Sequence, residues 1–86
     1  MTVEAEIDFA RLDRSVQVRV TERLRWFQTN FERIVLFPLE GKWLRFFKLR
    51  AGDWRVIYST NEPERIVTVH LIDHRGRIYK KRPPTL

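Results

Sequence analysis

The sequence predicts an α+β domain in which two amino-terminal helices pack on one face of a small antiparallel β-sheet of three to four strands. Three observations lead to this prediction. Residues 2–37 contain no glycine and no proline, and their apolar side chains recur at spacings of three and four. After Gly41 the apolar period changes to two, as in a strand with one buried face. Turn-forming residues then divide the second half of the chain into short consecutive segments, which is typical of a meander.

The chain of 86 residues has room for one domain with one modest core, so residues 1–86 are interpreted as a single unit. We expect residues 1–37 to be helical, residues 43–80 to form the sheet and residues 81–86 to be a basic tail. No apolar run approaches the roughly 20 residues of a membrane helix, and the amino terminus has no signal-peptide pattern. The expected location is therefore the cytoplasm, without a membrane partner.

The composition gives little support to metal or cofactor chemistry. No cysteine is present, which excludes disulfides and thiolate zinc sites and fits a reducing compartment. Two histidines, His70 and His74, are too few for a histidine-rich metal site, so no metal and no cofactor are expected. His70 falls inside an expected strand and is interpreted as structural. His74 lies in a polar link, where an imidazole could act near neutral pH.

One apolar face runs along both expected helices. Asp13 and Ser15 are good amino-terminal caps, so a short helix is expected to end near Leu12 and a longer one to begin near Arg14. Charged residues fall away from the apolar face. This face consists of Phe9, Leu12, Val16, Val20, Leu24, Phe27 and Phe31. These residues are therefore predicted to pack against the sheet.

The loop before the sheet is bracketed by Pro38 and Gly41. Three strands are expected, over residues 43–50, 54–59 and 66–72. The segment around Gly52 supplies a tight turn, because glycine can adopt a positive φ. A second turn is expected over residues 61–64. After a polar link, residues 78–79 are expected to resume extended structure.

Strand alternation predicts a row of positive charge on one face of the hairpin. Side chains two apart in a strand point the same way, so Lys48 and Arg50 share one face while Leu49 points to the helices. If Val56 also points into the core, Arg55 joins these cations on the open face. Side chains of the same sign on neighbouring strands repel one another unless an anion lies among them. The alternative is a basic sheet face without a ligand.

The net charge of +6 is unevenly distributed along the chain. Residues 1–40 contain six arginines and seven acidic residues, a net charge of −1. Residues 41–86 contain eleven lysines and arginines and four acidic residues, a net charge of +7. A concentration of positive charge of this kind favours a polyanion, most often a nucleic acid, as partner. A solvated basic surface is the alternative.

Two segments carry a resemblance to a known family. The stretch "KLRAGDWRVIYS" at residues 48–59, followed by "HLIDHRGRIYK" at residues 70–80, resembles the RelE/ParE superfamily of bacterial and archaeal toxins, on the RelE side. The segments "RLDRSVQVRVTERLRW" and "PLEG" also resemble the second helix of the family and the loop before its sheet. The likeness extends from about Arg11 to Lys80.

The resemblance implies the RelE-like fold, a cognate antitoxin as partner, and ribosome-dependent cleavage of mRNA. Lys48, Arg50 and Arg55 match the basic residues of the family hairpin, and Arg55 falls on the arginine most tied to cleavage. Arg75 and Tyr79 match the later arginine and tyrosine, with Tyr79 at the usual terminal catalytic position.

The sequence departs from the family pattern at two places. Phe46 stands where well-studied members carry a second lysine. The amino terminus starts at an expected helix, where family members usually begin with a strand, so one interpretation is that the first strand of the family fold is missing. An unpaired sheet edge is usually covered or used for dimerisation, which leaves a homo-oligomer open.

Metal-free RNA cleavage requires a base for the 2′-hydroxyl, cations around the phosphate and an acid for the leaving 5′ oxygen. A guanidinium holds two phosphate oxygens at once, which suits Arg55, with Arg50 or Arg75 as alternatives for a second such group. Lys48 is a candidate base or electrostatic stabiliser, and Tyr79 is a candidate proton donor or acceptor. The expected product is a 2′,3′-cyclic phosphate. The residues predicted to bind RNA are Arg50, His74, Arg77, Lys80 and Lys81.

Two other functions stay open at this point. A ParE-type toxin would inhibit DNA gyrase by binding, without an enzymatic reaction. A degenerate member of the family would be inactive and would only bind its antitoxin. The pairing of Arg55 with Tyr79 favours the enzyme, because a protein inhibitor has no need of that pair.

Overall fold

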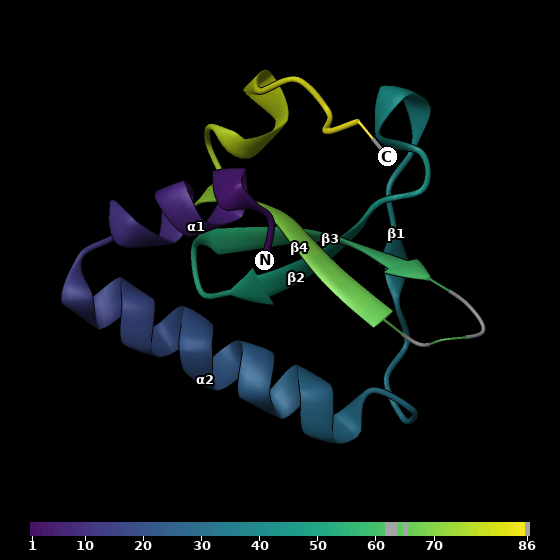
Figure 1. Cartoon of the computed structure of the whole chain (residues 1–86), viewed down its shortest axis with the longest axis horizontal. Coiled ribbons are helices and arrows are strands. Elements are labelled where there is room, and N and C mark those ends of the chain that lie inside the picture. Colours follow the sequence, from purple (N-terminus) through teal and green to yellow (C-terminus); the bar gives the residue numbers. More distant parts are fainter. Residues whose placement is uncertain (62–63, 65, 86) are drawn as a thin grey trace.

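The computed structural model describes residues 1–61, 64 and 66–85. Two helices precede a four-stranded antiparallel sheet with the strand order β1-β2-β3-β4 (Figure 1). The elements are α1 (Val3–Ala10), α2 (Arg14–Asn30), β1 (Phe37–Pro38), β2 (Phe47–Ala51), β3 (Trp54–Asn61) and β4 (Ile66–His74). The predicted α+β architecture is confirmed. Within the described residues, no helix is both long and apolar enough to cross a membrane.

Three predicted boundaries are wrong. The helical part ends at Asn30, short of residue 37, because the chain turns back to lay β1 beside Lys48 and Phe47. Residues 43–46 are not a strand: a 3₁₀ turn at Gly41–Trp43 precedes β2, and Arg45 has a φ of 83°. Residues 78–79 belong to a second 3₁₀ turn, Ile78–Lys80, because the Ile78 side chain is buried beneath it.

The second predicted turn, over residues 61–64, falls largely outside the described part of the chain. Asn61, its first residue, is the last residue of β3. The third predicted strand is longer than expected and continues as β4 to His74.

The second helix begins at Arg14, as predicted from Asp13, and the first helix begins directly after Thr2. The Thr2 hydroxyl accepts a hydrogen bond from the Ala5 N–H at 3.1 Å at the start of α1. The second helix follows Asp13, whose backbone carbonyl accepts from Gln17 at 2.9 Å while its side chain makes no cap bond. All seven residues of the predicted apolar face lie in or against the core between the helices and the sheet.

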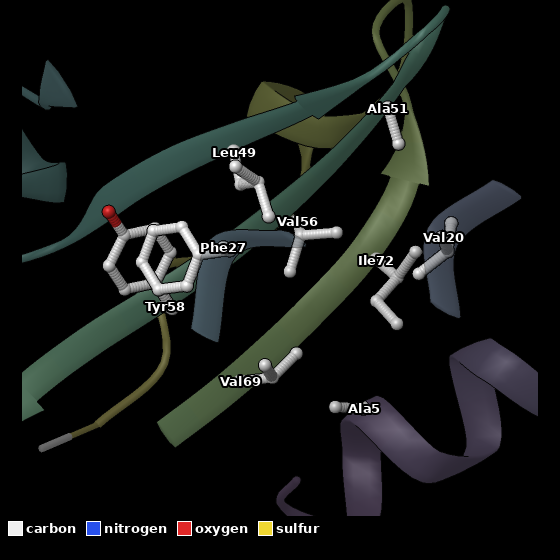
Figure 2. Close-up of a cluster of buried hydrophobic side chains, with 9 residues drawn as sticks. All are labelled: Ala5, Val20, Phe27, Leu49, Ala51, Val56, Tyr58, Val69 and Ile72. Atoms are coloured by element: carbon white, nitrogen blue, oxygen red, sulfur yellow. The ribbon is translucent and has the colours of Figure 1, made fainter. Parts of the chain in front are cut away.

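The helix-side core is built on the face of the sheet that α2 covers (Figure 2). The ring of Tyr58 stacks on Phe47 with the ring centroids 5.5 Å apart and meets Phe27 edge-on at 4.8 Å. Leu49 and Val56 lie in this core, so the predicted alternation along the hairpin is confirmed. Burial raises the pKa of Tyr58 to about 12.

A second, smaller core lies on the other face of the sheet, beneath the carboxy-terminal segment. Trp43, Phe46, Ile57, Leu71 and Ile78 form it. The face that the sequence predicted to be open is therefore partly covered, while Arg50 stays exposed near the hairpin turn. Figure 1 shows the carboxy-terminal segment in yellow on the side of the sheet opposite to α2.

The β3–β4 register shifts between Ile57 and Tyr58, and this places the His70 ring on the second-core face. His70 Nε2 lies 2.8 Å from the Ser59 hydroxyl, and both residues are buried. Burial lowers the pKa of His70, so the neutral imidazole is favoured. The prediction of a structural role for His70 agrees with this geometry.

The outer edge of β4 is covered by the amino-terminal segment. The Thr2 N–H donates to the Val69 carbonyl at 2.9 Å, and the Ile72 N–H donates to Asp8 Oδ2 at 2.9 Å. The first helix therefore lies along this edge as well as against the helix-side core, to which it contributes Ala5. An edge covered in this way is protected from pairing with a second sheet.

Gly52 provides a test of the hairpin turn. Its φ is +63°, and a Cβ added there would lie 2.9 Å from Arg19 Nη1. We expect Gly52→Ala to lower the free energy of unfolding by about 1–2 kcal/mol, measured by urea denaturation, because the left-handed conformation is unfavourable for alanine. Gly41→Ala, at a φ of +62° in open space, should cost the same or slightly less. Gly76→Ala, where no positive φ occurs, should be close to neutral. Equal stability of Gly52→Ala and Gly76→Ala would contradict this account of the turn.

Candidate functional site

Two arginines face each other across the β2–β3 hairpin. Arg50 on β2 is directly opposite Arg55 on β3 in the strand register. Opposed residues on antiparallel strands have Cβ atoms about 4.5–5.5 Å apart, and like charges at that separation destabilise the sheet. No carboxylate in the described part of the chain forms an ion pair with either guanidinium. Among the described residues, the two guanidinium groups therefore keep their positive charge without an ion-pair partner.

The Arg55 guanidinium is bound on one side only. Its Nη1 donates to the Gly52 carbonyl at 2.8 Å and to the Trp54 carbonyl at 3.0 Å, both at the hairpin turn. A guanidinium has five N–H donors in a planar fork, so most of them remain for another ligand. These two bonds hold the side chain in a defined place without neutralising its charge.

Tyr79 is the third member of this site. Its ring meets Trp43 edge-on with the ring centroids 5.7 Å apart, and 40% of the residue is exposed. Burial raises the pKa of Tyr79, while the positive charges of Arg55 and Arg50 act in the opposite direction. The phenol is therefore within electrostatic reach of both guanidinium groups. The structure places Arg50 and Arg55 opposite each other in the strand register, with Tyr79 within the range at which both charges act on its phenol.

Lys48 lies on the same face, two residues along β2 from Arg50. In the register it is flanked by Phe37 of β1 and Ile57 of β3, and it is half-buried. Phe46 is 97% buried in the second core, with its ring edge-on to His70 at 5.3 Å. The position where relatives carry a second lysine therefore has a packing role here.

Three cations that the sequence assigned to catalysis or RNA binding are paired with carboxylates. Arg75 Nε lies 3.6 Å from Asp53 Oδ1, in an exposed pair at the hairpin turn. Arg77 Nε lies 3.0 Å from Asp73 Oδ1. Lys81 is also paired, so residues 81–85 do not start as a loose tail. Lys80 is exposed at the end of the second 3₁₀ turn.

His74 points away from the site. Alternation along β4 places it opposite Trp54, and its ring meets the Trp54 ring edge-on at 5.5 Å. Trp54 packs against the helix-side core, so His74 lies on the other face of the sheet from Arg55. Its Nδ1 accepts a hydrogen bond from the Gly76 N–H at 3.2 Å. The structure thus gives His74 a local role in the turn after β4.

Asp73 is a residue of this region that the sequence did not single out. It is directly opposite Arg55 in the β3–β4 register. Burial alone would raise the pKa of Asp73, but hydrogen bonds from the His74 N–H and from Arg77, with the attraction of Lys81, lower it below its ordinary value. The register that places Asp73 there depends on the shift at Ile57, and no residue pattern predicts that shift.

A groove between α2 and the edge of β2 is a second surface with functional potential. It has a volume of about 280 Å³, and its lining includes Trp26, Phe37 and Lys48. Trp26 and Phe37 are exposed. The Arg23 guanidinium lies over the Trp26 ring at 4.1 Å, and Arg23 Nε donates to the Arg50 carbonyl at 2.9 Å. Among the described residues, no cluster of three potential metal ligands is found.

Comparison with known proteins identifies the family. A family model described as the ParE toxin of the type II toxin–antitoxin system parDE matches residues 1–79. The chain belongs to this toxin family. The resemblance to the RelE/ParE superfamily is confirmed, and the chain is a toxin of a type II toxin–antitoxin system.

Two solved structures share the fold of this ParE-family chain. One is the toxin–antitoxin complex RelBE2 from Mycobacterium tuberculosis, with 25% sequence identity, a TM-score of 0.75, and a match covering 86% of this chain and 91% of that chain. The other is the RelB–RelE antitoxin–toxin complex from Methanococcus jannaschii, with 16% identity, a TM-score of 0.67, and coverage of 92% and 93%. At 16% identity the likeness concerns the fold alone. Comparison with the curated proteins finds no match.

The titration of Tyr79 tests the geometry of the site. Arg55→Met should raise the pKa of Tyr79 further, because it removes a positive charge that favours the phenolate. Arg50→Met should give a smaller rise. Spectrophotometric titration in a Tyr58→Phe background isolates the signal, because the chain has two tyrosines. Arg25→Met, on the exposed side of α2, is the control. An unchanged Tyr79 titration in Arg55→Met would show that the two side chains are not neighbours.

Proposed function

We propose that this toxin is a ribosome-dependent mRNA endoribonuclease that cleaves without a metal. The observation that supports the proposal is the meeting of two guanidinium groups, Arg50 and Arg55, beside the phenol of Tyr79. A cation pair without an internal carboxylate suits a phosphodiester, and a phenol beside it suits proton transfer. An inhibitor that acts only by binding protein needs neither group in this arrangement.

The arginine pair is proposed to bind the scissile phosphate. A phosphate between Arg50 and Arg55 would relieve the repulsion between them and could accept hydrogen bonds from both. Arg55 is already fixed by the two carbonyls of the turn, so little side-chain freedom is lost when the phosphate binds. During the reaction the same donors would stabilise the additional negative charge on the pentavalent phosphorus.

The proposed reaction is an attack of the 2′-hydroxyl oxygen on the adjacent phosphorus. The new O–P bond closes a 2′,3′-cyclic phosphate, and the bond to the 5′ oxygen breaks. Lys48, in its neutral amine form, is the proposed group that accepts the 2′-hydroxyl proton, since it lies on the same face as Arg50; only the neutral amine has the lone pair that this step needs. Tyr79 is the proposed donor to the leaving 5′ oxygen, because a phenol carries its proton at neutral pH and the positive charges of Arg55 and Arg50 favour the phenolate that the transfer leaves behind.

The shape of the site supports a role for the ribosome. Arg50 is exposed, and 40% of Tyr79 is accessible to solvent, so the two residues lie on an open surface. Such a surface has few contacts with which to orient a flexible single strand. A message already held in place by the ribosome would avoid that entropic cost.

Cleavage by defined variants tests the proposed function. Arg55→Ala should lower the cleavage rate by about 10²–10³-fold, because it removes a donor that stabilises the transition state. Tyr79→Phe should lower it by about 10²–10⁴-fold, because it removes the proton donor. The measurement is primer extension on a message in a reconstituted translation system, with and without ribosomes. Arg25→Ala should cleave like the parent chain. Full activity of both site variants, or a 3′-hydroxyl product end, would exclude this mechanism.

Inhibition of DNA gyrase is the second candidate function. The family model that matches this chain is described as the ParE toxin of parDE. This description favours inhibition of gyrase, the activity of ParE-type toxins. Phe46 also favours it, since the acid–base lysine of relatives is replaced by a buried ring. A supercoiling assay with the same variants separates the two functions. Inhibition of gyrase that survives Tyr79→Phe, without RNA cleavage, would establish this alternative, and a chain inactive in both assays would be a degenerate member.

We propose that the groove between α2 and β2 receives an apolar and acidic segment of the cognate antitoxin. Both solved structures described above are complexes of a toxin with its antitoxin. Trp26 and Phe37 supply exposed apolar surface, while Arg23 and Lys48 supply positive charge. β1 pairs with Phe47 and Lys48, and in the described part of the chain no strand lies beside the β2 edge beyond them. An extended acidic peptide could pair with this edge.

Trp26→Glu should separate antitoxin binding from toxicity. The added carboxylate should repel an acidic segment and reduce apolar contact, so the cognate antitoxin should no longer restore growth when expressed with the variant. The variant itself should still arrest growth, because Trp26 lies on α2, outside the arginine–tyrosine site. Gln28→Glu, on the other side of α2, is the charge-matched control. Neutralisation of Trp26→Glu equal to that of the control would place the antitoxin elsewhere.

A further inference from the structure

Arg55 has a carboxylate as its direct neighbour but does not pair with it. The β3–β4 register places Asp73 opposite Arg55, and opposite charges in such positions normally attract. Arg55 Nη1 bonds instead to the carbonyls of Gly52 and Trp54. This separation needs a physical cause, because a pair with Asp73 would neutralise the arginine that the proposed function uses for phosphate.

Two cations from the carboxy-terminal segment form ion pairs with the Asp73 carboxylate. Arg77 Nε lies 3.0 Å from Oδ1, and Lys81 Nζ lies 3.4 Å from Oδ2. The His74 N–H donates to Oδ1 as well, at 2.7 Å. Both carboxylate oxygens of Asp73 are therefore engaged. Its side chain is 13% exposed, so these contacts are screened less than those of a surface pair.

Lys81 is itself held in place by a second carboxylate. Lys81 Nζ also lies 3.5 Å from Asp8 Oδ1, and Asp8 Oδ2 accepts the Ile72 N–H at 2.9 Å. Between the two cations, Ile78 is fully buried in the second core. The segment that carries Tyr79 is thus anchored by Ile78 and by Lys81, and Lys81 bridges the carboxylates of Asp73 and Asp8.

We propose that Arg77 and Lys81 are positioning residues that keep the Asp73 carboxylate away from Arg55, so that Arg55 stays available for phosphate. This inference rests on the proposed function, and it gives both cations a role other than direct RNA contact. Arg75 acts in the same way on Asp53 in the turn, but that pair is exposed and therefore weaker.

Removal of both cations should redirect Asp73. A largely buried carboxylate without a counter-charge is unfavourable, so the Asp73 side chain should form an ion pair with Arg55, which faces it across the strands. An arginine side chain is long enough to span directly opposed positions. Arg55 would then be neutralised without any substitution in the binding pair itself.

The test compares a double variant with a triple variant that removes the competing carboxylate. The probe is a fluorescein-labelled 2′-O-methyl hexauridylate, which cannot be cleaved, and binding is measured by fluorescence anisotropy at low salt. Arg77→Met/Lys81→Met should weaken binding about tenfold, the loss of one charge-assisted contact. Adding Asp73→Asn should return the affinity to within about threefold of the parent chain. Residues that bound RNA directly would show no such recovery.

Charge-matched controls separate this effect from the change in net charge. Arg14→Met/Arg25→Met removes two exposed cations from α2, and adding Asp13→Asn removes one acid nearby. These controls should change the affinity only slightly, without a loss and recovery. A double variant no weaker than its control, or a triple variant no better than the double, would overturn the proposal.

The Tyr79 titration is a readout that does not depend on RNA. In the double variant Asp73 should offset the attraction of Arg55 for the phenolate, so the pKa of Tyr79 should rise, and in the triple variant it should return. A chain that cleaves no RNA but shows this rise and return would lose the proposed function and keep this inference. Thermal melting checks that each variant is folded. Where the double variant is unfolded, Lys81→Met with and without Asp73→Asn gives the same comparison, and an unmoved Tyr79 titration there would also overturn the proposal.

Discussion

The register of the β2–β3 hairpin is the constraint on which the rest of this structure depends. A two-residue turn begins at Gly52 with a positive φ and pairs Ala51 with Trp54. Because the side-chain period of a strand is two, a slip of one residue would move every side chain to the other face. The observed register sends Leu49 and the apolar residues opposite it into the helix-side core. It also places Arg50 opposite Arg55, so two positive charges repel each other at the candidate site. This local cost in stability is compensated by the rest of the fold.

The second core explains how a short carboxy-terminal segment can contribute to a site. Ile78 is fully buried against the face of the sheet opposite to α2, and Trp43 holds the ring of Tyr79 from the other side. Phe46 belongs to the same cluster, so the residue that departs from the family pattern helps to hold the catalytic candidate in place. Phe46 thus has a packing role at the position where the sequence departs from the family pattern.

The positive charge of the second half divides into two groups with different physical roles. Arg50 and Arg55 have no carboxylate partner in the described part of the chain, whereas Arg77 and Lys81 share Asp73. The net charge of +6 that suggested a polyanion therefore overstates the charge available to bind one. A cation of a basic sequence adds to a binding site only if no carboxylate of the protein pairs with it. Only the three-dimensional structure shows which cations are paired.

The sequence by itself determined the order of the two helices and of β2, β3 and β4, the apolar face from Phe9 to Phe31, and, through strand alternation, the face of the sheet on which Arg55 lies. Each of these follows from a local period or a local turn, which a linear pattern records. The tertiary structure alone decided that residues 43–46 turn, that His74 faces the helices, and that Asp73 lies opposite Arg55. These outcomes depend on contacts between residues far apart in the chain, on a register shift in β3, and on burial beneath the last turn, none of which has a period along the sequence.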